Sequence, residues 1–363
     1  MTAVAVIGAG AGGAAAVAEL SLAGHEVRWW NRNPATIAPF REAGGVRYQG
    51  VLGEGFARPA AFADELGGAL DGADLAMVCL ASLAHEVVAG ALADAGVSCP
   101  VLLNPGHTGG ALHVAAVFHE RGVEAPPLVE LSTLTYVARK PDLASVRITG
   151  AAGRVWAACL PGGEDPLELV QTLYRAATPA RDVIASSLAN VNLVLHAPGA
   201  ILAAAWVEAT GGEFRFYVDA MTPGVARSIE ALDRERLAVA AAFGHELPPL
   251  VEEMAAIGTV DDADAVARRD TRAAIAGGEA NRLIRAPDSL DHRYYAEDFG
   301  YGLVPMLELA RIGGVEAPYA AALVEVASVL RGEDLRATGL TAERLGVAGL
   351  DREGVLALVR GAG

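Results

Sequence analysis

Lysine is almost absent from this chain: Lys140 is the only lysine among 28 basic residues. The acidic residues number 44, so the formal net charge is -16 and the isoelectric point is about 4.9. A surface of this charge repels the phosphates of nucleic acids and of anionic lipids, which argues against nucleic acid and membranes as partners. An anionic small molecule would therefore need a local basic or dipolar site.

Cysteine is scarce as well. The three cysteines have no CxxC spacing and read as small core residues of a cytoplasmic protein, not as a disulfide framework or a metal site; they are Cys79, Cys99 and Cys159. The N-terminus lacks a basic stretch before its apolar run, so no signal peptide is predicted. The longest apolar stretch, Leu188 to Val207, contains two asparagines, His196 and Pro198, which argues against a membrane span.

Apolar residues, alanine above all, are abundant, and 53% of the chain is hydrophobic. A length of 363 residues fits two domains. The first half alternates short apolar runs with helical patterns, which predicts a parallel sheet with crossover helices. The predicted strands are Val4 to Gly8, Glu26 to Trp30, Leu75 to Leu80, Val101 to Pro105 and Leu128 to Leu134. A late hairpin is also predicted, from Arg147 to Gly150 and Arg154 to Leu160.

Strand patterns nearly vanish from Ser186 onward, where long segments rich in Ala, Leu, Glu and Arg have helical spacing. We therefore predict an α/β Rossmann-type domain over residues 1–182 and an all-α domain over residues 183–363. The active site is expected between them. The sequence leaves open whether the chain forms a homodimer.

The strongest local motif is VIGAGAGG, which places Gly8, Gly10 and Gly13 in a G-x-G-x-x-G pattern between a strand and an alanine-rich helix, Gly13 to Leu22. The first glycine permits a tight turn, the second lets the backbone approach a pyrophosphate, and the third lets helix and strand pack closely. The free N–H groups at the helix start then favour phosphate. An ordinary glycine-rich turn is the alternative.

The end of the second strand bears on the choice of cofactor. NAD-binding domains usually have an acidic residue there, which holds the ribose 2′-hydroxyl. This chain has Asn31 and Arg32 instead, so no carboxylate repels a 2′-phosphate and Arg32 could pair with one. We therefore expect NADP(H) to be favoured over NAD(H). A solvated Arg32 with no such role is the alternative.

Three candidates for chemistry lie in the helical half. Asn192 and His196 are four residues apart on one helical face, and His196 is either a core histidine or an acid/base. Arg293 could hold a carboxylate with its planar fork, and Asp298 could fix the tautomer of His196. A salt bridge between Arg293 and Asp298 is the alternative that spacing alone leaves open.

Polar residues follow two strands of the first half and are harder to interpret. The turn Asn104 to Gly110 could border a nicotinamide or be a plain strand-to-helix turn. His107 within it could touch a substrate, although a lone loop histidine is more often a surface residue. Glu130 and Thr133, at the end of the next strand, could likewise border a ligand or have only a structural role.

Taken together, several segments make the chain resemble the octopine/nopaline (opine) dehydrogenase family over nearly its whole length. The segments are the glycine loop, NPGHTGGAL, ELSTLTYVAR, NVNLVLHAPGAIL, GGEFRFYVDAMTP, SIEALDRERLAVAAAFG and APDSLDHRYYAEDFGYGLVP. The resemblance implies a helical domain like the C-terminal domain of 6-phosphogluconate dehydrogenase. It also implies reductive condensation of an amino acid or other amine with a 2-oxo acid through an imine, with NAD(P)H as hydride donor.

The resemblance also assigns roles to residues. His196 falls on the acid/base of the family, Arg293 on the arginine that binds the 2-oxo acid carboxylate, and Asp298 on the partner of the histidine. Related dehydrogenases with a helical second domain, such as the ketopantoate and 3-hydroxyisobutyrate enzymes, use a lysine early in that domain. This chain has none there, which favours His196 as proton donor.

This chain departs from the family pattern where an amine would be contacted. Ala203 to Glu208 lacks an asparagine that relatives often carry, and Ala220 replaces a common glycine. Nearby apolar and aromatic residues would suit a less polar amine than arginine; they are Trp206, Phe216, Tyr217 and Tyr294. A plain 2-oxo acid or ketone reductase and a non-catalytic NADP-binding protein are the alternative functions.

Overall fold

The computed structural model describes residues 1–361, except for the side chain of Ala280. Its internal contacts divide the chain into two compact units. The first contains residues 1–106 and 110–183, and the second contains residues 107–109 and the described residues from Ile184 to Gly361. The division falls beside the predicted boundary near residue 182; that the two segments fold as separate domains stays a prediction.

The first unit is built on an eight-stranded sheet of order β12-β11-β8-β7-β6-β1-β2-β5. Its strands are β1 (Ala3–Ile7), β2 (Glu26–Trp30), β5 (Ala61–Phe62), β6 (Leu75–Val78), β7 (Val101–Leu103), β8 (Leu128–Leu131), β11 (Val155–Leu160) and β12 (Ala177–Pro179). The six neighbouring strands β8-β7-β6-β1-β2-β5 all pair in parallel, as predicted. Strand β11 runs antiparallel to β8. Strand order reverses beside β1, which is where such sheets bind ligands.

A second sheet of four strands has the order β4-β3-β10-β9. Its strands are β3 (Val46–Gly50), β4 (Gly53–Ala57), β9 (Tyr136–Arg139) and β10 (Ser145–Ala151). The predicted hairpin is therefore wrong: both of its strands exist, but β10 pairs with β3 and β9 while β11 pairs with β8 and β12. The turn therefore joins two different sheets: β10 belongs to the four-stranded sheet and β11 to the eight-stranded sheet.

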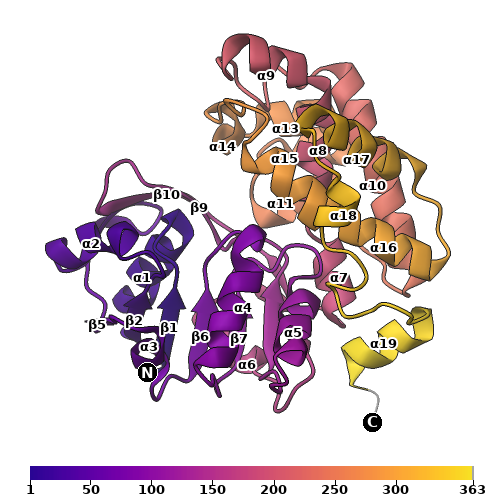
Figure 1. Ribbon diagram of the computed structural model, residues 1–363. Helices are drawn as coiled ribbons and strands as arrows, with labels where there is room; N and C mark the ends of the chain where they lie inside the picture. The colour runs from indigo at the N-terminus through magenta and orange to yellow at the C-terminus, as the bar shows by residue number, and fades with distance from the viewer. Residues whose placement is uncertain (362–363) are drawn as a thin grey trace. The chain divides into compact units, whose positions relative to one another are not determined.

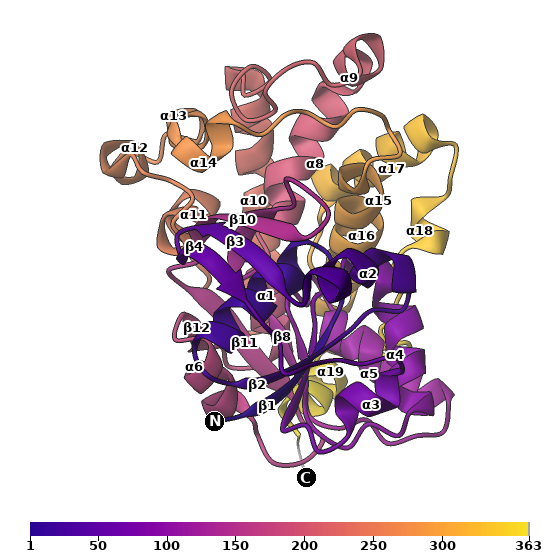
Figure 2. The ribbon, with the colours of Figure 1, turned by 90° about the vertical axis from the view of Figure 1, so that its left-hand side faces the viewer.

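Helix α1 (Ala11–Leu22) contacts strands of both sheets, and Figure 2 shows β3, β4 and β10 above it. A helix covered on several sides has no use for a polar face, which accounts for its run of buried alanines. The other helical segments of this unit are α2 (Pro34–Ala43), α3 (Leu66–Leu70), η1 (Ser82–Ala84), α4 (His85–Asp94), α5 (Gly110–Glu120) and α6 (Leu167–Leu173). Helices α4 and α5 lie side by side in Figure 1.

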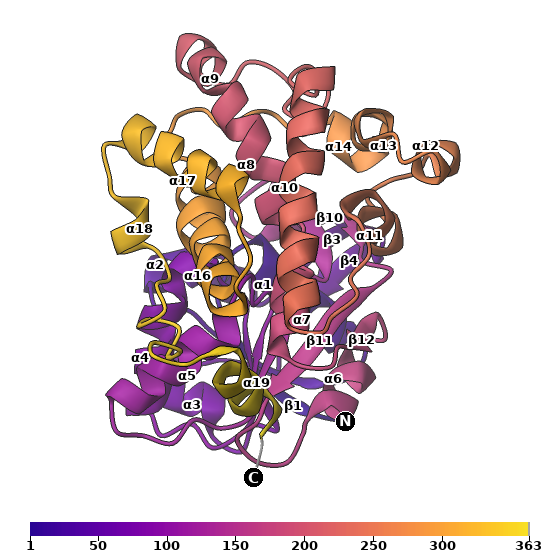
Figure 3. The same cartoon turned by 90° about the vertical axis from the view of Figure 1, so that its right-hand side faces the viewer.

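The second unit is helical, as predicted. Its longest helix, α10 (Pro223–Ala242), packs against α8 (Asn192–Leu202), α16 (Val304–Gly313) and α17 (Pro318–Arg331), as Figure 3 shows. The remaining helical segments are α7 (Val183–Leu188), α9 (Ala204–Thr210), α11 (Leu250–Ile257), α12 (Ala263–Ala267), α13 (Thr271–Gly277), α14 (Glu279–Arg282), α15 (Arg293–Asp298), η2 (Phe299–Leu303), α18 (Leu335–Thr338) and α19 (Arg352–Arg360).

The charged residues of α10 join this helix to its neighbours. Asp233 accepts from Arg236 at 2.8 Å, which makes a salt bridge within the helix. Arg236 is fully buried and also donates to the carbonyl oxygens of Leu188 and Pro248, while Glu235 accepts from backbone N–H groups at the start of α17. These contacts fix helix ends and leave no group for chemistry.

One apolar stretch, Val183–Leu202, is long and apolar enough by composition to cross a membrane. In the structure 89% of that stretch is buried inside the protein, as in a core helix. Asn190 and His196 within it are buried together with its apolar residues, and Asn192 is half-buried.

Candidate active site

The glycine loop has a geometry that suits a phosphate ligand. Gly8 has φ +117°, and a Cβ there would lie 2.7 Å from the carbonyl oxygen of Cys79 after β6. A Cβ on Gly13 would lie 2.0 Å from the carbonyl oxygen of Gly8, so this glycine lets α1 touch the loop. A Cβ on Gly10 meets nothing within 4 Å, which leaves open space where a pyrophosphate would sit.

The start of α1 supports the same interpretation. Its N-cap is Gly10, no side chain caps it, and its first turn contains no acidic residue. The N–H groups of that turn, with the positive end of the helix dipole, are thus available to an anion. Asn31 does not contribute a charge: its Oδ1 accepts from the backbone N–H of Ala9 at 2.9 Å and so braces the loop. Arg32 is exposed.

In the second unit, His196 and Asp298 meet although 102 residues separate them. His196 Nδ1 lies 2.7 Å from Asp298 Oδ2, and both side chains are buried, at 7% and 6% exposure. Asp298 ends α15 and His196 lies in the middle of α8. The carboxylate therefore fixes the ring through Nδ1, which leaves Nε2 as the nitrogen that can exchange a proton.

Glycines allow α8 to approach its neighbours this closely. The π-helical turn η2 follows α15 directly, and a Cβ on its Gly302 would lie 3.0 Å from Cβ of Leu193 in α8. On the other side of α8, a Cβ on Gly199 would lie 3.0 Å from the ring of Phe216. Each glycine permits a contact that a larger residue would separate, and together they hold His196 against Asp298 and the aromatic residues.

Aromatic rings cover His196. The Tyr294 ring stacks on the imidazole, with centroids 3.9 Å apart and planes 17° apart, and the Tyr217 ring lies 6.1 Å away. The hydroxyl groups of Tyr217 and Tyr294 are 3.3 Å apart, and burial together with Tyr294 raises the pKa of Tyr217. The phenol of Tyr217 is therefore neutral at ordinary pH and can serve only as a neutral hydrogen-bonding group.

Arg293 begins α15 and forms its ion pair with Glu297, whereas Asp298 pairs with His196. Its NH1 lies 3.4 Å from Oε2 of Glu297, one helical turn later. The Glu297 side chain is 3% exposed, whereas that of Arg293 is 47% exposed. Burial disfavours the charge on Arg293, but Glu297 and Asp298 outweigh this effect and raise its pKa. Arg293 is thus a permanent cation, anchored on one side and open on the other.

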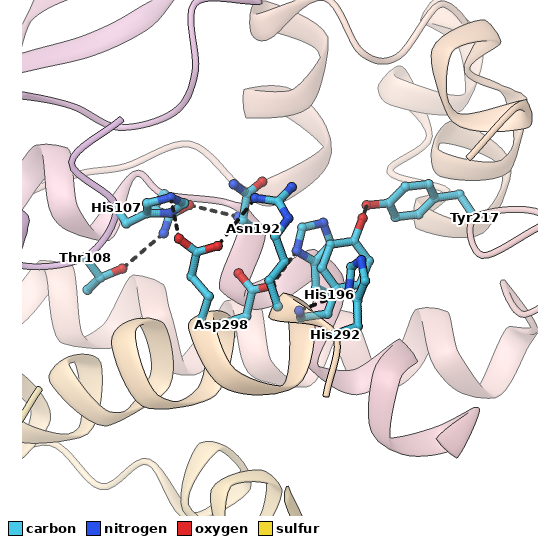
Figure 4. A network of polar contacts seen from close by, with 11 residues as sticks. His107, Thr108, Asn192, His196, Tyr217, His292 and Asp298 are labelled. Carbon is cyan, nitrogen blue, oxygen red and sulfur yellow. Dashed lines mark hydrogen bonds and ion pairs between the residues drawn. The ribbon is translucent and has the colours of Figure 1, made fainter. Parts of the chain in front are cut away.

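His107, which the sequence left undecided between a substrate contact and a surface position, is part of the same network. The surface position favoured for it is wrong: His107 is buried, and its Nε2 lies 3.1 Å from the second oxygen of Glu297. Burial disfavours its protonation, but the charge and hydrogen bond of Glu297 raise the pKa of His107 above its ordinary value. Figure 4 shows His107, His196 and Asp298 in one network of polar contacts.

The turn that carries His107 is held in place by the second unit. Thr108 Oγ1 accepts from Asn190 Nδ2 at 3.2 Å, and the N–H of Gly109 donates to Ser187 Oγ at 2.9 Å. His107 itself has φ +59°, in the left-handed region that non-glycine residues rarely adopt. The spacing of Arg293 and Glu297, four residues apart on a helix, was the one sequence signal that could have revealed this network.

Glu130, which the sequence left ambiguous, and two other polar residues near the family segments have structural roles. Glu130 is fully buried, and its Oε2 accepts from the backbone N–H of Ala111 at the start of α5. Asp219, the acidic residue of the FYVD stretch, pairs with Arg215 within the same loop at 2.6 Å. His292 accepts from the backbone N–H of Tyr294 and caps α15.

Comparison with known proteins places the chain in a family. Residues 179–331 match the α-helical domain of NAD/NADP octopine/nopaline dehydrogenases, and residues 4–102 match the ketopantoate reductase PanE/ApbA family. A curated relative, an opine dehydrogenase of Arthrobacter sp. (strain 1C), is 31% identical over 98% of both chains.

Solved structures agree with this in fold. An octopine dehydrogenase in complex with NADH and agmatine has a TM-score of 0.79 at 20% identity and covers 99% of this chain and 98% of its own. A yersinopine dehydrogenase with NADP⁺ bound has a TM-score of 0.73 at 15% identity, covering 99% and 98%. These likenesses extend over both units of the chain.

Proposed function

The chain belongs to the octopine/nopaline (opine) dehydrogenase family, and we propose that its site joins an amine or amino acid to a 2-oxo acid. The family confirms the resemblance predicted from the sequence, and with it an NAD(P)-dependent oxidoreductase that acts on CH–NH groups. The reaction is reductive condensation: amine and 2-oxo acid lose water to form an imine, which is then reduced. One observation supports it most, the buried His196–Asp298 pair beside a half-exposed arginine.

In this proposal Arg293 binds the carboxylate of the 2-oxo acid. Its guanidinium is the cation of the site, and its exposed side offers a planar pair of N–H donors that matches a carboxylate. Glu297 forms an ion pair with the buried side of the Arg293 guanidinium through one carboxylate oxygen. His107 contacts the other oxygen of Glu297 and so fixes that carboxylate. The substrate carboxylate would meet an arginine whose orientation is already fixed, which lowers the entropic cost of binding.

His196 moves the proton. A nicotinamide cofactor held at the glycine loop would supply the hydride that reduces the imine. Nε2 of His196 donates a proton to the nitrogen in the reductive direction and takes one back in the oxidative direction. Asp298 stabilises the imidazolium form and fixes the ring, while the stacked Tyr294 restricts its tilt.

The aromatic surroundings support an amine that is less polar than arginine. Among the relatives, octopine dehydrogenase is described in complex with agmatine and with L-arginine, and in another structure with pyruvate. In this chain Phe216, Tyr217 and Tyr294 pack together next to His196. An apolar or aromatic side chain on the amine would find contacts there.

The cofactor preference that we propose is NADP(H) over NAD(H). Gly8, Gly10 and Gly13 with the start of α1 would hold the pyrophosphate, Asn31 braces the loop, and exposed Arg32 has the charge to pair with a 2′-phosphate. Titration of NADPH and NADH into the wild type and Arg32→Ala tests this. We expect NADPH to bind the wild type more tightly and the variant to lose that preference. An equal preference in both proteins contradicts it.

The reaction itself is tested by a panel of 2-oxo acids crossed with a panel of amines, followed by NADPH absorbance. We expect oxidation of NADPH that requires both partners, with the highest rates for amines that have apolar or aromatic side chains. Oxidation with a 2-oxo acid alone, unaffected by amines, would instead indicate a plain reductase. Binding of NADPH without turnover of any pair would indicate a non-catalytic protein. A cytoplasmic location stays a prediction, and whether the chain forms a homodimer stays open.

A further inference from the structure

The only lysine of the chain lies beside the glycine loop. Lys140 follows β9 directly, and its Nζ lies 3.5 Å from the carbonyl oxygen of Ala9, inside the G-x-G-x-x-G motif. The same ammonium stands over the Phe40 ring at 4.4 Å from the ring centre. All other basic residues of the chain are arginines. The position of this lysine beside the glycine loop suggests a role in the loop's function.

The contacts of Lys140 place its charge close to where phosphates would sit. Asn31 binds the N–H of Ala9 on one side of the loop, and Lys140 reaches the carbonyl of the same residue. Gly10, the next residue, borders open space at the start of α1. The ammonium has three N–H donors, of which the carbonyl of Ala9 uses one and the ring face another. A donor therefore remains for a ligand.

The charge balance of the molecule favours an anion as that ligand. With a net charge of -16, the protein needs local cations wherever a multiply charged phosphate is to bind. Partial burial lowers the pKa of Lys140, and the nearby Asp142, which is exposed, only partly opposes this. An anion at the loop would remove this penalty, because an opposite charge favours the ammonium form.

We propose that Lys140 is a phosphate-binding residue of the dinucleotide site, bridging the carbonyl of Ala9 and a phosphate of the cofactor. This inference rests on the proposed function, since it requires that the chain bind a dinucleotide. The pyrophosphate, common to NADH and NADPH, and the 2′-phosphate, present in NADPH alone, are the two groups that fit. The alternative is a purely structural Lys140 that clamps Phe40 of α2.

Because Lys140 is unique, it can be observed directly. Growth on ¹³C-labelled lysine labels Lys140 alone and keeps its charge and all three of its N–H donors. Lys140→Arg removes this signal and so confirms its assignment. We expect the Lys140 signal to shift on addition of cofactor and its pKa, followed through the same signal, to rise. Adenosine, which has no phosphate, should leave it unchanged.

Two cofactors distinguish the two phosphates. A shift with both NADH and NADPH assigns Lys140 to the pyrophosphate, and a shift with NADPH alone assigns it to the 2′-phosphate. The inference is overturned if cofactor fluorescence shows binding while the Lys140 signal stays in place. The proposed function fails separately, if the wild type binds neither cofactor.

Substitutions give a second readout. Lys140→Gln should raise the Kd of the bound cofactor about tenfold, which corresponds to about 1.4 kcal/mol, and the effect should shrink as salt screens the contact. Lys140→Arg should bind nearly as well as the wild type. The matched control is Arg139→Gln, which removes the neighbouring charge of an exposed side chain and should change Kd little. A Lys140→Gln protein with a lower melting temperature but wild-type Kd would establish the structural clamp instead.

Discussion

The two parts of the proposed site are built in different ways. In the first unit the glycine loop lies within residues 8–13, and it offers backbone N–H groups and empty space to its ligand. In the second unit, side chains from α8, from α15 and from the turn at His107 meet around two buried carboxylates. A phosphate site can be made from backbone alone, whereas proton transfer requires particular side chains whose positions only tertiary packing can set.

Buried carboxyl groups in the two units differ in their partners. Glu297 and Asp298 are buried, but each faces a histidine, and Glu297 also faces Arg293. Glu19 in α1 is different: burial raises its pKa from 4.5 to about 7, against a hydrogen bond with Tyr136 that lowers it. The two paired carboxyl groups belong to the proposed site. Glu19 instead lowers the stability of the fold at higher pH, because its carboxyl group must then ionise while it is buried.

His196→Ala tests the side-chain half of the comparison with the largest expected effect. We expect kcat to fall by about 10²–10⁴-fold, because positioned acid/base groups contribute about that much. NADPH binding should be nearly unchanged, since the glycine loop is in the other unit. Steady-state kinetics and a fluorescence titration of NADPH measure the two quantities. Unchanged turnover would remove His196 from the mechanism.

Arg293→Ala should mainly weaken binding of the 2-oxo acid. The loss of charged hydrogen bonds to a carboxylate, about 1.5–3 kcal/mol, raises KM for the oxo acid by about 10–10²-fold. Arg293→Lys keeps the charge but loses the planar fork, so it should recover only part of the binding. Arg311→Ala, at an exposed arginine of α16, is the control. Normal saturation by oxo acid in Arg293→Ala would contradict the assignment.

Glu19→Gln sharpens the contrast between buried carboxyls. The folded state keeps the proton of Glu19 up to about pH 7, whereas the unfolded chain releases it near pH 4.5. Stability therefore falls as pH rises through this window. The glutamine amide does not ionise in this range. The free energy of unfolding of the variant at pH 8 should therefore be up to about 3 kcal/mol higher than that of the wild type. Urea unfolding between pH 5 and pH 8 measures this.

The control for that measurement is Glu120→Gln, at an exposed position of α5, which should not change the slope. If Glu19→Gln loses stability with the same pH dependence as the wild type, the carboxylate is charged in the folded protein and its contact with Tyr136 outweighs burial.

Gly10→Ala and Gly13→Ala separate the two uses of glycine in the loop. A Cβ at Gly10 meets no atom of the protein, so the fold should be kept while Kd for the cofactor rises by about tenfold or more. A Cβ at Gly13 would collide with the carbonyl oxygen of Gly8, so this variant should lose stability first. Thermal melting and cofactor titration distinguish the two outcomes. Tight binding by Gly10→Ala would contradict a phosphate at this position.

Local patterns predicted well wherever the interactions are themselves local. The strands at Glu26 to Trp30 and Leu75 to Leu80, the helix after Gly13 and the change to helices near Ser186 all follow from periodicity within a few residues. Strand pairing failed at the predicted hairpin because neighbours in a sheet are chosen over the whole unit, and β10 and β11 found different sheets. Arg293, Asp298 and His196 could be named from their segments, and the family resemblance paired Asp298 with His196, but the contacts of Glu297 with His107 and Arg293 were not predicted.

By itself, the sequence determined the glycine loop, the missing acid at Asn31, the order of elements and the family. These depend on backbone freedom, charge and periodicity, which a chain carries before it folds. The tertiary structure decided that Asp298 meets His196, that Glu297 lies between His107 and Arg293, and that Lys140 reaches Ala9. Those choices join residues up to 190 positions apart, and only packing determines which of many possible partners a buried charge receives.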